Sequence, residues 1–156
     1  MRMRLIIGAT ITALATACGT STSTSTAPAT GDVGAVGTAQ NESGLREAAR
    51  AYLDAWSTGN TATICTLLEA RTAAEFTAKV RAPDCPAAVH VLYDRMSDQV
   101  RASLRDVQFT EVKQQSGSGT QGHVVVGAKV PVLGNDLSTD WSYKSGRWQI
   151  RERPRE

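Results

Sequence analysis

The chain has 156 residues, of which 41% are hydrophobic and 21% are charged, and its formal net charge is +2. A nucleic-acid-binding domain would carry a basic excess clustered on one face, whereas acidic and basic residues are interspersed here from Arg46 to Glu156. The composition therefore argues against a nucleic-acid partner. The length suits a single small domain with one core.

The first 18 residues have the pattern of an export signal. Arg2 and Arg4 give a basic start, an apolar run occupies residues 5–17, and small residues lead directly to Cys18. This order is typical of a secretory signal peptide, and its end resembles the lipobox of bacterial lipoproteins. The resemblance implies that residues 1–17 are removed and that Cys18 is lipidated. The protein would then be anchored by lipid to the cell membrane, on its extracytoplasmic side.

An ordinary secretory signal stays open as an alternative. The lipobox usually has Leu three residues before the cysteine, and this chain has Ala15 there. Cleavage after Ala17 without lipidation would leave Cys18 as a free thiol. A membrane-spanning helix is disfavoured, because a bilayer core requires about 20 apolar residues.

Residues 18–43 are predicted to be a flexible, lipid-anchored linker. They consist mainly of Thr, Ser, Ala and Gly with almost no charge, so they cannot bury enough apolar surface to offset the entropy of ordering. The Ser/Thr tract resembles the glycosylated stalks of some actinobacterial lipoproteins, and an unmodified spacer is the alternative. The folded domain is expected at residues 44–156.

Helices are predicted in the first part of this domain. Ser43 is a candidate N-cap, apolar residues recur at helical spacing from Leu45 to Trp56, and Gly59 provides a stop. A short second helix, capped by Asn60 or Thr61, contains Cys65.

Two more segments complete the helical part. Residues 71–80 fit either a helix or a short edge strand, with a helix preferred. Asp84 and Pro86 predict the start of a further helix, whose inward residues continue through Met96 to Val100.

Beyond Arg105 the apolar pattern alternates with a period of two, which predicts strands. The expected strands are Val107–Lys113, Gly122–Val132, Leu137–Lys144 and Arg147–Arg153. A two-residue turn at Ser145-Gly146 would set Tyr143 opposite Trp148 and Trp141 opposite Ile150 on one face. Val112 is out of phase with Val107 and Phe109, which predicts a bulge or an end of pairing.

Helices followed by an antiparallel sheet indicate an α+β fold, with the N-terminal helices packed on one face of a curved sheet. The stretches AARAYLDAWSTGN at 48–60, CTLL at 65–68 and WSYKSGRWQI at 141–150 resemble the nuclear transport factor 2-like (NTF2-like) fold, as found in exported actinobacterial lipoproteins. The resemblance covers about Leu45 to Arg153 and implies a sheet wrapped around a long helix, with a cone-shaped cavity at one end. It implies no particular reaction, because this fold hosts isomerases, cyclases, dehydratases and non-catalytic modules.

The three cysteines divide into one lipid carrier and one pair. Once Cys18 is assigned to the lipid, Cys65 and Cys85 remain, in a compartment that permits disulfides. They are predicted to be joined, and two buried free thiols are the alternative.

Catalysis by an isomerase-like member of this fold requires a carboxylate or histidine base inside the cavity and a donor that stabilises an enolate. Asp54, Asp140 and His123 are predicted to point outward, and His90 to lie on the flank of its helix. We therefore predict no catalytic residue, no cofactor and no metal site. The large side chains expected to point inward are aromatic: Tyr52, Trp56, Tyr93, Phe109, Trp141, Tyr143 and Trp148.

These aromatic side chains either line a small-molecule pocket or form the core, and the core is preferred. The outer sheet face is either solvated or a homodimer contact; it carries Asp140, Lys144, Arg147, Gln149 and Arg151. The sequence thus predicts a non-catalytic lipoprotein that binds a protein partner or a small apolar ligand at the cell surface. The alternative is an isomerase- or cyclase-like enzyme that uses Tyr52, Tyr93 or Tyr143 as a donor.

Overall fold

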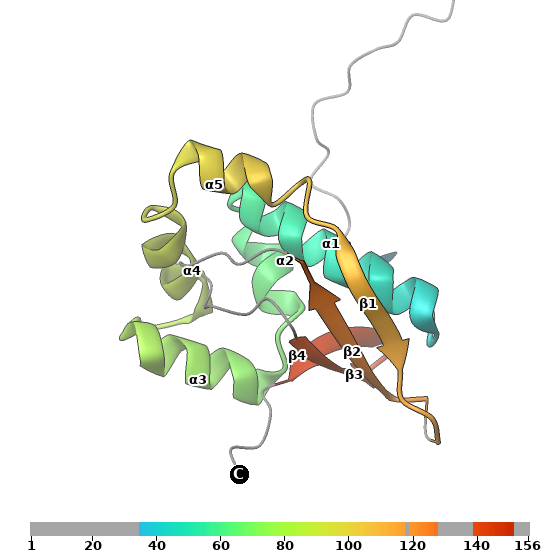
Figure 1. Ribbon diagram of the computed structural model, residues 1–156. Coiled ribbons are helices and arrows are strands. Elements are labelled where there is room, and N and C mark those ends of the chain that lie inside the picture. The colour runs from blue at the N-terminus through green and yellow to red at the C-terminus, as the bar shows by residue number, and fades with distance from the viewer. Residues whose placement is uncertain (1–34, 118, 128–138, 152–156) are drawn as a thin grey trace, which may run out of the picture. The chain divides into compact units, whose positions relative to one another are not determined.

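The structure is a computed structural model that describes residues 35–117, 119–127 and 139–151. The predicted α+β class is confirmed: helices come first and an antiparallel sheet follows (Figure 1). The helices are α1 (Glu42–Thr58), α2 (Thr61–Thr66), α3 (Ala70–Val80), α4 (Cys85–Tyr93) and α5 (Asp98–Ser103). The strands are β1 (Phe109–Gln114), β2 (Gln121–Val126), β3 (Thr139–Lys144) and β4 (Arg147–Arg151).

The N-cap of α1 is Asn41 and not Ser43, which was the expected residue. The side-chain oxygen of Asn41 accepts a hydrogen bond from the Gly44 backbone N–H at 2.9 Å, whereas Ser43 lies inside the first turn. A cap oxygen must reach an N–H two or three residues ahead, and Asn41 meets that condition. The helix ends as expected at Gly59, in the left-handed conformation with φ 72°.

The shorter helices mostly begin where they were predicted to begin, but one predicted helix is wrong in its extent. Asn60 caps α2, Asp84 caps α4, and residues 70–80 form a helix and not a strand. The helix expected to run on to Val100 is instead two helices, because α4 ends at Tyr93 and α5 begins at Asp98. The side chain of Ser97 accepts a hydrogen bond from Val100 N at 3.3 Å, so a local N-cap replaces a continued helix.

The strands are paired in the order β1-β2-β3-β4, each antiparallel to its neighbour. β1 starts at Phe109, two residues later than expected. The expected extensions of the other strands, to Val132, from Leu137 and to Arg153, lie mainly outside the described residues.

The hairpin of β3 and β4 has the predicted register. Trp141 pairs with Ile150 and Tyr143 with Trp148. The turn residues Ser145 and Gly146 have φ values of 51° and 80°, which is the backbone that a two-residue type I′ turn requires.

The irregularity predicted near Val112 is a β-bulge. The register of β1 against β2 shifts between Phe109 and Glu111, and one extra residue restores the alternation of faces. Val112 therefore faces inward like Phe109, at 8% exposure, beside Val124.

Helix α1 lies against the inner face of the sheet at very short range. A Cβ atom at Gly122 in β2 would lie 2.5 Å from Leu45 Cδ2, so any larger residue there would displace the Leu45 side chain. The first half of α1 packs on the sheet, and its second half packs on α2, α4 and the α5–β1 region. The buried side chains form two clusters, one against the sheet and one among the helices, and α1 contributes residues to both.

The folded unit begins before residue 44, the expected boundary. Gly37 and Ala39 accept hydrogen bonds from the backbone and indole N–H of Trp148, at 3.0 and 2.9 Å. The Tyr143 hydroxyl donates to the carbonyl oxygen of Thr38. Part of the segment expected to be a linker therefore closes one end of the sheet.

The predicted disulfide between Cys65 and Cys85 is present, and the two Cα atoms are 6.0 Å apart. It joins α2 to the start of α4. We expect the double variant Cys65→Ala/Cys85→Ala to lower the free energy of unfolding by about 3 kcal/mol, because the bond restricts the unfolded chain. Urea denaturation measures this loss, and Cys18→Ser is the matched control without effect. An unchanged midpoint in the double variant would contradict a stabilising role.

Arg50 of α1 forms hydrogen bonds with the connection between α5 and β1. Its guanidinium donates to the carbonyl oxygens of Leu104 and Arg105, at 3.4 and 3.2 Å, and to that of Val107. It also lies 4.8 Å from the ring centroid of Phe109.

We expect Arg50→Met to lower the free energy of unfolding by about 2 kcal/mol, because it leaves partly buried carbonyls without their charged donor. Arg46→Met is the control on the same helix, since the exposed Arg46 only approaches Phe109 at 6.0 Å. It should change stability by less than about 0.5 kcal/mol. Urea denaturation measures both variants. If both lost the same free energy of unfolding, the bonds from Arg50 to the carbonyl oxygens would not be the source of the stabilisation.

Candidate functional site

The aromatic residues predicted to point inward separate into a buried group and a partly exposed group. Trp56, Trp141 and Trp148 are each at most 1% exposed. Tyr52 lies between two of them, with ring centroids 6.2 Å from Trp56 and 6.4 Å from Trp141, in edge-to-face geometry. Phe76 of α3 continues the series against Trp56 at 6.4 Å. Such pairs stabilise a core beyond their buried area.

The partly exposed aromatic rings are held by polar contacts. The Arg101 guanidinium lies 4.0 Å from the ring centroid of Tyr93. Arg50 occupies the corresponding place at Phe109. The Tyr143 ring packs on Trp148 at 5.5 Å, while its hydroxyl bonds to the N-terminal segment.

Two polar groups lie within this aromatic series. The indole N–H of Trp56 is buried beside Tyr52. Burial raises the pKa of Tyr52 above its ordinary value of 10.0, and the neighbouring Trp56 indole opposes the shift in part. The shift therefore extends the neutral form of Tyr52 to higher pH than for an exposed tyrosine.

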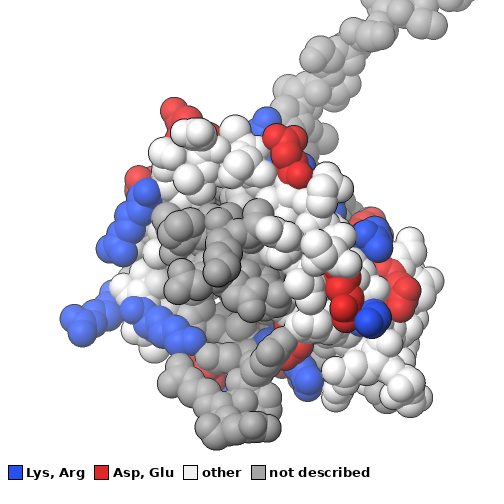
Figure 2. Space-filling view, in the orientation of Figure 1, with Lys and Arg blue, Asp and Glu red and all other residues white. Residues whose placement is uncertain are grey.

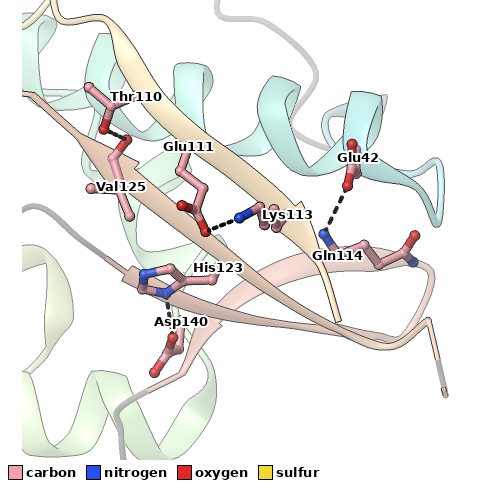
Figure 3. Close-up of polar contacts among 8 residues, drawn as sticks. All are labelled: Glu42, Thr110, Glu111, Lys113, Gln114, His123, Val125 and Asp140. Carbon is pink, nitrogen blue, oxygen red and sulfur yellow. Dashed lines mark hydrogen bonds and ion pairs between the residues drawn. The ribbon is translucent and has the colours of Figure 1, made fainter. Parts of the chain in front are cut away.

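The outer face of the sheet carries a row of polar side chains in direct register. Lys113, His123, Asp140 and Arg151 follow one another across the four strands. His123 Nδ1 lies 2.7 Å from Asp140 Oδ1 (Figure 3). His123 thus lies on the outer face, as expected, but the side chains of His123 and Asp140 are only 23% and 11% exposed. His90 is exposed, as expected.

Further contacts stabilise the exposed edge formed by β1. Lys113 pairs with Glu111 at 3.3 Å, and the Thr110 hydroxyl donates to the Val125 carbonyl at 3.2 Å (Figure 3). Figure 2 shows basic side chains at several separate places of the visible face, with acidic ones close to several of them. This dispersion agrees with the interspersed charges of the sequence.

The His123–Asp140 pair has one feature of a catalytic dyad. A carboxylate on Nδ1 fixes the orientation of an imidazole that acts as a base. A nucleophile would have to bond to the other ring nitrogen. Ser142, the next residue on the same face of β3, donates its hydroxyl to Glu69 instead. The described contacts therefore assign this serine to a structural bond.

Residues 35–117, 119–127 and 139–151 contain no group of three or more His, Cys, Asp or Glu side chains that could hold a metal ion. None of the helices described there is long and apolar enough to cross a membrane.

Comparison of the chain with protein-family models, with curated proteins and with solved structures found no match. What the molecule does must therefore be inferred from its own residues.

The raised pKa of Tyr52 predicts how the stability of the protein depends on pH. A group whose pKa is raised in the folded state contributes stability that is complete below its unfolded value, here 10.0, and is lost as the pH rises through the folded value. We expect the free energy of unfolding of the native protein to fall more steeply above pH 10 than that of Tyr52→Phe. Urea denaturation of both proteins from about pH 8 to about pH 11 measures the difference, and parallel curves would contradict it.

Proposed function

We propose that this protein is an exported bacterial lipoprotein, anchored through Cys18 to the outer side of the cell membrane. The observation that carries the proposal is the order of the first 18 residues: two arginines, an apolar run and small residues directly before Cys18. Such a run is long enough for a signal peptide and short for a bilayer span. The disulfide between Cys65 and Cys85 supports export as well, because such bonds persist in oxidising compartments.

We propose further that the domain has the NTF2-like arrangement, with a cone formed by the sheet around the long helix. Support comes from α1, which packs along the inner face of the antiparallel sheet, and from the aromatic hairpin of β3 and β4. In this proposal the domain is a non-catalytic binding module for a protein partner or a small apolar ligand. A homodimer through the outer sheet face stays a prediction.

The contacts of the three tyrosines favour binding over catalysis. The enzyme alternative needs Tyr52, Tyr93 or Tyr143 as the donor to a substrate. Tyr52 instead packs between tryptophan rings, Tyr93 lies under Arg101, and the Tyr143 hydroxyl is bonded to Thr38. The rings of all three tyrosines thus have structural contacts, and the hydroxyl of Tyr143 is itself engaged in one.

Substitution of Cys18 tests the anchor. In the native bacterial host, Cys18→Ser should release the protein from the membrane fraction or leave its precursor uncleaved, because serine cannot accept the lipid through a thioether. Ser23→Ala, which keeps the cysteine, is the matched control and should fractionate with the membrane. Membrane retention and normal processing of Cys18→Ser would overturn the proposal.

A further inference from the structure

A polar cleft with a volume of about 350 Å³ lies where the first turn of α3 meets the outer face of the sheet. It is distinct from the aromatic interior, and its volume is within the range of small-molecule sites, roughly 300 to 1,000 Å³. Its lining residues are Glu69, Arg71, Thr72, Thr120, Gln121, Ser142, Tyr143, Lys144 and Arg151.

Most charges in this cleft already have partners. Glu69 accepts the Ser142 hydroxyl and lies 3.1 Å from Lys144 Nζ, and Arg71 pairs with Glu75 at 2.8 Å. The carboxylate of Glu69 is only 14% exposed, whereas its partner Lys144 is 59% exposed, so solvent reaches the pair from the lysine side. The negative charge in the cleft is therefore balanced.

Arg151 is the exception. Its described side-chain partner is the neutral Oε1 of Gln121, at 3.4 Å. Its Nε is buried and has no hydrogen-bond partner in the described part of the chain. Asp140 stands directly opposite in the sheet, but its described contact is with His123. The cleft is nevertheless lined by three basic side chains, Arg71, Lys144 and Arg151, against the single carboxylate of Glu69, and this excess of positive charge favours an anion.

The N-terminus of α3 also favours an anion in this cleft. Glu69 is the N-cap of α3 but makes no capping hydrogen bond, because its carboxylate is engaged with the sheet. The first turn, with Arg71 and Thr72, borders the cleft. Helix N-termini attract anions through their N–H groups and the positive end of the dipole.

We propose that this cleft binds the carboxylate or phosphate group of a small polar ligand, with Arg151 as the principal contact and Lys144 and the first turn of α3 beside it. Planar guanidinium groups hold such oxyanions through two parallel N–H bonds, and Arg151 is one of the residues that line the cleft. The hydroxyl and amide groups of Thr72, Thr120 and Gln121 recognise the polar remainder of the ligand. The inference goes beyond the proposed function and holds with or without the lipid anchor.

Calorimetric titration of the purified full chain tests the site, with glutarate and inorganic phosphate as separate probes. We expect saturable binding of at least one probe and a loss of about tenfold or more in affinity for Arg151→Gln, the effect of removing a charged hydrogen bond. Lys113→Gln is the matched control, because Lys113 lies in the same cross-strand row but outside the cleft. It should stay within about twofold of the native affinity.

Two further measurements keep the test decisive if Arg151→Gln does not fold. The exposed Lys144→Gln should weaken binding several-fold, and the Nε–Hε signal of Arg151 should shift on titration of the native chain. Binding of glutarate alone identifies a carboxylate ligand, and binding of phosphate alone a phosphorylated one. The proposal is overturned if neither probe saturates below about 10 mM, if folded Arg151→Gln binds normally, or if Lys113→Gln weakens binding equally.

Discussion

The contact between α1 and the sheet at Gly122 is the constraint on which the rest of the structure depends. Because Leu45 occupies the space of a side chain at that position, the helix can approach β2 closely and continue along the sheet through Ala48 and Ala49. The same helix then carries Tyr52 and Trp56 beyond the sheet to the smaller helices. The edge-to-face series of rings joins the two clusters, so the helical part and the sheet share one core.

A second constraint arises where the chain passes from α2 to α3. Ile150 of β4 exchanges backbone hydrogen bonds with Leu67 and Glu69, at 2.7 and 2.9 Å. The connection therefore covers the outer edge of β4, which would otherwise expose unpaired backbone groups. It also brings Glu69 over Ser142 and Lys144. The side chain cannot cap α3 from there, and the polar cleft beside the first turn of this helix follows from that pairing.

Local patterns in the sequence were sufficient for much of the fold. Alternation and the Ser145-Gly146 turn predicted the β3–β4 register, and the phase error at Val112 predicted the bulge, because both depend on neighbours in the chain. The break before Ser97 was missed because Met96 and Val100 keep helical spacing across it. Among the polar residues, the disulfide was predicted by elimination among three cysteines. The His123–Asp140 pair was not predicted, since it depends on the register of β2 against β3. The position of Glu69 was not predicted either, because it depends on contacts with Ser142 and Lys144, which are far away in the sequence.

Arg50 and Arg151 differ in how many of their donors are used within the described fold. Arg50 donates to three backbone carbonyls and lies over an aromatic ring, so its donors are used within the fold. Arg151 donates to one neutral amide and keeps a buried Nε without a partner among the described residues. An unpaired buried donor costs about 1 to 3 kcal/mol, which packing elsewhere must offset. The proposed anion site thus uses an arginine whose donors are only partly engaged within the described part of the chain.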